Sequence, residues 1–220
     1  MGVFTAVSYE MMQRYLAYLE SKADHHIVSF GLGDWYDIGP DRPGKAQLTP
    51  IALTATAFYH EDARILARVA ALLGKPEEAR KYQELADSIR AAFNQRFFDP
   101  AKGSYATGSQ CANAIPLAMN LAEPARRVAI IAALVRDVRD RGNALTAGDV
   151  GYRYLLRALA DGGRSDVIFA LNNQSDKPSR HDRPAIGAPS VHFRGWARRQ
   201  DFRQRRSRRA RYVDGKLRSR

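Results

Sequence analysis

The sequence lacks three features that would place it in a well-defined class at once. Cys111 is the single cysteine among 220 residues, so no internal disulfide framework can form. No apolar run approaches the roughly 20 residues that cross a bilayer. Met1 is not followed by the basic and apolar stretches of a secretory signal peptide. We therefore expect no membrane partner and take a cytoplasmic location as the default.

Acidic residues are scarce near the C-terminal end. Residues 178–220 contain no glutamate and hold thirteen arginines and one lysine against three aspartates. Their net charge of +11 accounts for nearly all of the +12 of the chain, because residues 1–177 hold 21 basic and 20 acidic side chains. Such an abrupt change of composition marks a boundary. We expect a folded domain over residues 1–177 and a disordered basic tail over residues 178–220.

Apolar residues recur at helical spacing through most of the first 177 residues. The pattern predicts seven helices, over residues 7–22, 50–74, 76–97, 109–121, 123–142, 149–159 and 164–173. Thr49 is expected to cap the second helix, with Pro50 at its first position. No strand pair is predicted, so the fold class is all-α.

The connections between these helices alternate in length. Long loops that contain glycine cover residues 23–48, 98–108 and 142–148, whereas the other connections are short turns. Every other connection in an antiparallel array lies at the same end, so the three long loops should meet on one face. This arrangement favours an (α/α) toroid or solenoid of helical hairpins over a four-helix bundle.

The loops carry candidate ligand-binding residues. Asp34, Trp35 and Asp37 combine an indole, which is a flat apolar platform for a sugar, with carboxylates that accept hydrogen bonds from hydroxyls. Gln110 and Asp149 stand where helices begin after the other two long loops. Together the five residues predict a carbohydrate site. The alternative is structural, with a buried indole and acids that cap turns and helices.

The sequence contains four motifs in this order: Gly-Asp-Trp-Tyr-Asp at 33–37, Leu-Thr-Pro at 48–50, Ala-Thr-Gly-Ser-Gln at 106–110 and Leu-Thr-Ala-Gly-Asp-Val-Gly at 145–151. In their order and spacing, these motifs resemble bacterial α-L-rhamnosidases of glycoside hydrolase family 78, over residues 5–177. The resemblance implies a six-hairpin (α/α)6 barrel, here an incomplete toroid. It also implies inverting hydrolysis of terminal α-L-rhamnosides by a general acid and a general base, on a rhamnose-containing glycoside and without a cofactor.

Neither catalytic carboxylate is expected in this chain. The resemblance puts the acid upstream of the Gly-Asp-Trp loop, in a segment expected before Met1. It puts the base in a Gly-Ala-Thr-x-x-x-Glu-x-Trp stretch after the seventh helix, where this chain has no glutamate beyond Pro178. We interpret residues 178–220 as an out-of-frame reading of a GC-rich gene. Without an acid–base pair, the chain alone should not turn over substrate.

Two further hypotheses stay open. The loop face is a carbohydrate-binding remnant without catalysis, or the arginine-rich run at 203–211 neutralises phosphates of a nucleic acid. A solvated tail is the plainer interpretation of that run. No metal site is predicted, because His25 and His26 are adjacent and His60 and Asp62 have no partner one helical turn away. The sequence does not set the oligomeric state.

Overall fold

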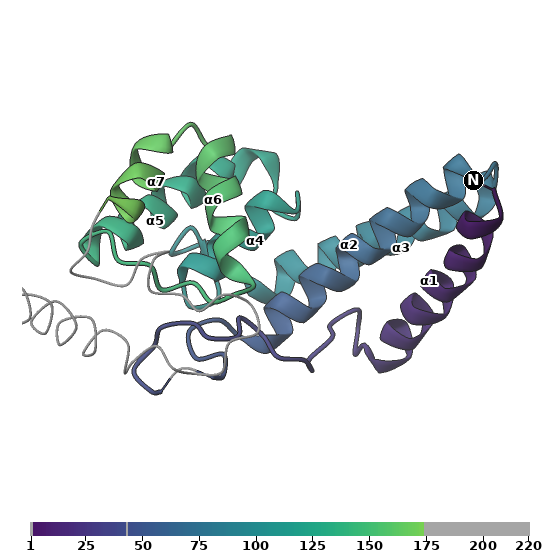
Figure 1. Cartoon of the computed structure of the whole chain (residues 1–220), viewed down its shortest axis with the longest axis horizontal. Helices are drawn as coiled ribbons and strands as arrows, with labels where there is room; N and C mark the ends of the chain where they lie inside the picture. Colours follow the sequence, from purple (N-terminus) through teal and green to yellow (C-terminus); the bar gives the residue numbers. More distant parts are fainter. Residues whose placement is uncertain (1, 43, 174–220) are drawn as a thin grey trace, which may run out of the picture. The chain divides into compact units, whose positions relative to one another are not determined.

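The computed structural model describes residues 2–42 and 44–173 (Figure 1). The basic segment over residues 178–220 lies outside this range, so its disorder and its proposed nucleic-acid contacts stay predictions. The elements are α1 (Gly2–Lys22), α2 (Ile51–Leu72), α3 (Pro76–Phe97), β1 (Phe98–Asp99), β2 (Ser104–Tyr105), α4 (Gln110–Ala118), the 3-10 helix η1 (Pro124–Arg126), α5 (Arg127–Asp140), α6 (Gly151–Asp161) and α7 (Ser165–Asn172).

All seven predicted helices are present, and the all-α class is confirmed. The expectation of no strand pair is wrong in one detail, because β1 pairs with β2 in an antiparallel hairpin that sets Phe98 opposite Tyr105. Strands of two residues are too short to show the alternation that identifies a strand in a sequence.

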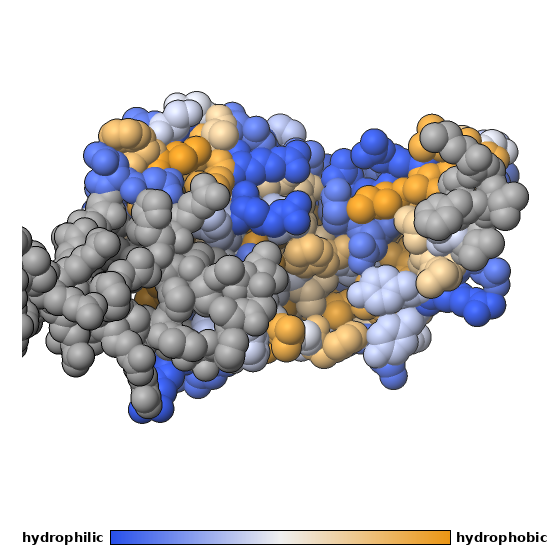
Figure 2. Space-filling model, in the orientation of Figure 1, coloured by the Kyte–Doolittle hydropathy of each residue, from blue (hydrophilic) through white to orange (hydrophobic). Residues whose placement is uncertain are grey.

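The first three helices share one core cluster. α2 and α3 lie side by side (Figure 1), and Gly74 takes a positive φ of 71° in the turn between them, a conformation that favours glycine. Leu16 and Leu19 of α1 pack with Tyr59 and Leu66 of α2. Figure 2 shows that apolar side chains also reach the surface over α1 and α2.

The remaining helices pack around α4. Every residue of α4 is buried, because the helix contacts α2, α5 and α6. α7 packs against α5 and α6. The hairpins thus place α4 between α2 and α6, which is the order expected in a section of an (α/α) toroid.

The predicted cap of α2 is wrong. The N-cap residue is Pro50, and no side chain caps it. Thr49 instead places its hydroxyl oxygen 2.7 Å from the Ser109 hydroxyl oxygen, so it links the start of α2 to the start of α4. Ser109 is the N-cap residue of α4, and its hydroxyl accepts a hydrogen bond from the amide of Ala112 at 3.2 Å.

Candidate functional site

Hydrogen bonds join the three long loops, as the alternation of connections predicts. The amide of Ile38 in the first loop donates to the Thr146 carbonyl in the third at 2.9 Å. The amide of Asp149 donates back to the Trp35 carbonyl at 2.7 Å. In the second loop, the Thr107 hydroxyl donates to a carbonyl at the end of the first loop at 2.6 Å. Segments far apart in sequence therefore form one surface.

Asp34 is the interior link between the first and third loops. Its side chain is fully buried, with one carboxylate oxygen accepting from the Gly148 amide and the other from the Gly151 amide, each at 2.7 Å. Gly151 is the first residue of α6, and the N-cap residue Val150 offers no side-chain bond. Because the first amides of a helix have no partner within it, Asp34 caps α6 from another loop.

Glycine is needed at both partners of Asp34. A Cβ atom on Gly148 would collide with the Trp35 carbonyl oxygen and the Asp34 carboxylate. A Cβ atom on Gly151 would lie 2.8 Å from an Asp34 carboxylate oxygen and 2.7 Å from the Cys111 Cβ atom. The two glycines therefore allow the carboxylate to approach the helix.

Burial dominates the electrostatics at this link. It raises the pKa of Asp34, against the hydrogen bonds from Gly148, Gly151 and Cys111, which lower it. Burial and the neighbouring Asp34 carboxylate raise the pKa of the Cys111 thiol well above its ordinary value. Cys111 of α4 is free and buried, so its thiol stays protonated at neutral pH and is not a nucleophile.

Asp37 closes the first loop on itself. Its buried carboxylate accepts hydrogen bonds from the amides of Gln47 at 2.9 Å and Leu48 at 2.6 Å. Tyr36, just before it, has a φ of 61°, in the left-handed region that bulky residues seldom adopt. The acid thus holds a strained turn that carries two aromatic side chains.

Gln110 binds the third loop from the protein interior. Its side chain is fully buried, and its oxygen accepts from the amides of Thr146 at 2.9 Å and Ala147 at 3.2 Å. Its amide nitrogen donates to the Ala144 carbonyl at 2.9 Å. One side chain therefore satisfies three backbone groups of the loop.

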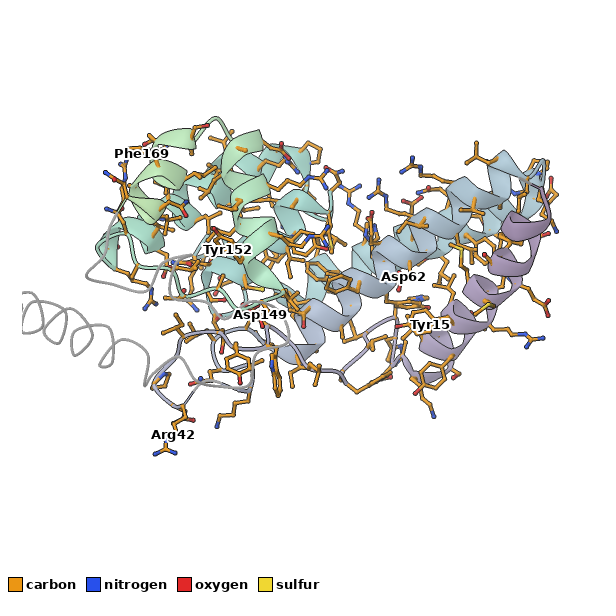
Figure 3. The ribbon with its side chains drawn as sticks, in the orientation of Figure 1. Tyr15, Arg42, Asp62, Asp149, Tyr152 and Phe169 are labelled. Atoms are coloured by element: carbon orange, nitrogen blue, oxygen red, sulfur yellow. The ribbon has the colours of Figure 1, made fainter. Side chains whose placement is uncertain are left out.

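Trp35 and Asp149 are placed differently from the other three candidates. Trp35 is half-buried and Asp149 is exposed (Figure 3), and the hydrogen bond between their main chains makes them neighbours. The Trp35 ring meets the Tyr36 ring edge to face, with 5.6 Å between centroids and 69° between planes. Trp35, Tyr36 and Asp149 therefore reach solvent, whereas the neighbouring Asp34, Asp37 and Gln110 are buried.

Of the five predicted residues, three are buried (Asp34, Asp37 and Gln110) and two reach solvent (Trp35 and Asp149). Their contact with a ligand stays a prediction. The sequence reasoning did not select Tyr36, although its position beside an indole was a signal. It also missed Gly148 and Gly151, whose part depends on a partner more than a hundred residues away.

Within the described residues, no group of three or more histidine, cysteine, aspartate or glutamate side chains is placed to hold a metal ion. None of the described helices is long and apolar enough to cross a membrane.

The chain is similar in sequence to known proteins of one family. Residues 4–188 match the family model of the bacterial alpha-L-rhamnosidase six-hairpin glycosidase domain. The alpha-L-rhamnosidase of Streptomyces avermitilis is 33% identical over 166 residues, which cover 75% of this chain and 15% of that protein. The alpha-L-rhamnosidase of Formosa agariphila is 27% identical over 175 residues, which cover 78% of this chain and 19% of that protein. The chain thus spans less than a fifth of the length of either protein.

Solved structures give the same result. The crystal structure of the Streptomyces avermitilis alpha-L-rhamnosidase complexed with L-rhamnose matches 80% of this chain and 16% of its own, at a TM-score of 0.71 and 31% identity. The structure of the alpha-L-rhamnosidase from Dictyoglumus thermophilum matches 78% of this chain and 20% of its own chain. Its TM-score is 0.72 and its sequence identity 31%. An enzyme of that name from Aspergillus terreus shares the fold at a TM-score of 0.66 and 23% identity, over 78% of this chain and 21% of that one.

Proposed function

The chain belongs to the bacterial alpha-L-rhamnosidase six-hairpin glycosidase domain family, and on that premise we propose that its loop face binds the rhamnose unit of a glycoside for a glycoside hydrolase. The Streptomyces avermitilis relative is described as complexed with L-rhamnose. This chain shares 31% sequence identity with that structure over most of its own length.

The observation that carries the proposal is the position of Trp35 beside Asp149 where the three loops meet. Rhamnose is a 6-deoxy sugar, so one part of its ring presents C–H bonds and a methyl group while the hydroxyls point elsewhere. An indole face suits the apolar part, and an exposed carboxylate suits the hydroxyls. In this proposal, Asp34, Asp37 and Gln110 position that pair from below and do not contact the sugar.

The burial of the Asp34 and Asp37 carboxylates supports a binding role without catalysis for the described residues. An inverting glycosidase needs an acid and a base whose carboxyl groups lie about 6.5–9.5 Å apart, with room for water. Asp34 and Asp37 are fully buried, and both oxygens of each accept backbone amides. Neither can take up or release a proton at a bound sugar. The proposal is therefore that this chain by itself does not hydrolyse rhamnosides.

Ligand binding by the full chain tests the proposal. Saturation-transfer NMR should detect L-rhamnose but not D-glucose, and Trp35→Ala should abolish the signal. Trp196→Ala is the matched control, because Trp35 and Trp196 are the two tryptophans of the chain. A signal that survives Trp35→Ala, or that D-glucose gives equally, would rule out the site. With p-nitrophenyl α-L-rhamnoside as substrate, we expect no release of p-nitrophenol above background. Measurable turnover would overturn the proposal that the chain by itself does not hydrolyse rhamnosides.

A further inference from the structure

A line of buried side chains leads from the start of α4 to the Asp34 carboxylate. The hydroxyl oxygen of Ser109, the N-cap residue of α4, lies 2.7 Å from that of Thr49. The Thr49 hydroxyl forms a hydrogen bond with the Cys111 thiol, and the thiol forms one with Asp34. None of these four residues is more than 7% exposed, so each polar proton in the line needs an acceptor within the protein.

The packing at Gly151 brings the last two members of this line together. A Cβ atom on Gly151 would lie 2.9 Å from the Cys111 sulfur and 2.8 Å from an Asp34 carboxylate oxygen. The thiol and the carboxylate therefore border the same small space at the start of α6. Because the glycine has no side chain to fill this space, the sulfur can approach the acid.

The number of protons fixes the direction of the hydrogen bonds. An ionised carboxylate only accepts, so the Cys111 thiol donates its proton to Asp34. The sulfur then accepts from the Thr49 hydroxyl, whose only proton is thereby used. Ser109 must accordingly donate to Thr49, and its oxygen still accepts from the Ala112 amide at 3.2 Å. Every O–H and S–H in the line thus points toward Asp34.

The surroundings of Asp34 make such donors valuable. Its two oxygens accept from the amides of Gly148 and Gly151, which can only donate, so a proton on either oxygen would displace one of these bonds. The positive end of the α6 dipole also favours an anion there. Burial and the charge of Asp37 act against ionisation and raise the pKa of Asp34, while the Cys111 thiol lowers it. Donors aligned in series polarise one another and strengthen the last bond of the line.

We propose that Ser109, Thr49 and Cys111 form a one-way donor chain that keeps Asp34 ionised at neutral pH, and that they thereby position the ligand-binding face. We call these three residues the donor chain. They are positioning residues, because all three are buried and act through Asp34. The effect on the ligand-binding face rests on the proposed function, whereas the effect on Asp34 does not.

Main-chain bonds connect the charge of Asp34 to the face above it. Asp34 precedes Trp35 and accepts from Gly148, which precedes Asp149. The Asp149 amide donates to the Trp35 carbonyl at 2.7 Å. A charged acceptor binds an amide more strongly than a neutral one, so protonation of Asp34 would weaken its hold on the third loop. Trp35 and Asp149 would then be less firmly held side by side.

A titration of the Asp34 carboxyl carbon by NMR on the full chain tests the donor chain without any ligand. Cys111→Ala removes the last donor and should raise the pKa of Asp34 by about one pH unit, and Cys111→Ser, which keeps a donor, should restore it. Thr49→Val should also raise this pKa, and Thr49→Ser should not. Thr54→Val is the matched control, because it removes a buried α2 hydroxyl that bonds only locally, to the Ile51 carbonyl. An unchanged pKa in Cys111→Ala and Thr49→Val variants that are folded by circular dichroism would overturn the donor chain.

Affinity for L-rhamnose at pH 7.5 tests the effect on the face. Thr49→Val should weaken binding by about fivefold or more, whereas Thr49→Ser and Thr54→Val should bind like the unmodified chain. A raised pKa of Asp34 with unchanged affinity would overturn the positioning role and leave the donor chain standing. An unmodified chain that does not bind L-rhamnose would overturn the proposed function and the positioning role together, and the titration would still decide on the donor chain.

Discussion

The Asp34 carboxylate lies 2.7 Å from the Gly151 amide nitrogen, although 117 residues separate the two in the sequence. This bond joins the first long loop to the first turn of α6. Since the neighbouring residues Trp35 and Asp149 are also bonded to each other through the main chain, the buried acid fixes the geometry of the surface above it. The site is thus a surface pair supported by an interior polar layer.

Removal of the Asp34 carboxylate should destabilise the domain. Asp34→Ala leaves the amides of Gly148 and Gly151 buried without a partner, and we expect a loss of about 3 kcal/mol in the free energy of unfolding. Urea unfolding followed by circular dichroism measures it. Asp140→Ala, at an exposed acid on α5, should change the free energy by less than about 0.5 kcal/mol. Equal effects of the two substitutions would show that Asp34 is not a structural link.

A methyl group at Gly148 should be costly for steric reasons. Its Cβ atom would collide with the Trp35 carbonyl and the Asp34 carboxylate, so Gly148→Ala should cost about 3 kcal/mol. Gly103 has a φ of 61° and open space around a Cβ atom, so Gly103→Ala should cost only the backbone strain, about 1 kcal/mol. Thermal unfolding of the two variants compares them. If Gly103→Ala is the more damaging, the close packing at Gly148 is wrong.

His60 should make the domain sensitive to mild acid. Burial, helped by the charges of Arg64 and Arg90, lowers the pKa of His60 to about 4 in the folded chain, against about 6.5 when unfolded. The unfolded chain therefore binds the proton first, and stability falls as the pH drops from about 6.5 to about 4, by up to about 3 kcal/mol. His60→Leu should remove this part of the pH dependence in urea unfolding. The same replacement of the exposed His26 should not, and a profile unchanged by His60→Leu would contradict the assignment.

Asp62 should act in the opposite direction over nearly the same range. Its pKa of about 6 in the folded chain lies above the usual 3.8, so the folded chain binds the proton first and gains stability as the pH falls from about 6 to about 4. Asp62→Leu should accordingly stabilise the chain at pH 7.5, by about 1 kcal/mol after allowance for solvent, and less at pH 4.5. A stabilisation that does not depend on pH would mean that side-chain packing, and not charge, is responsible.

The helices could be predicted because each buries an apolar stripe that recurs at the helical period. The role of Asp34 could not, since its partners are backbone amides of Gly148 and Gly151, which carry no side-chain signal. The sequence predicts a local helix cap at Thr49, whereas its hydroxyl pairs with that of Ser109 sixty residues later.

A crystal structure of the chain with L-rhamnose would show directly whether the sugar lies on the face where the three long loops meet. We expect the apolar part of the sugar to lie on the Trp35 indole and a hydroxyl of the sugar to donate to the Asp149 carboxylate. We also expect Asp34 to keep its bonds to Gly148 and Gly151. A sugar that is bound directly by Asp34 or Asp37, or that lies away from the three loops, would contradict the account.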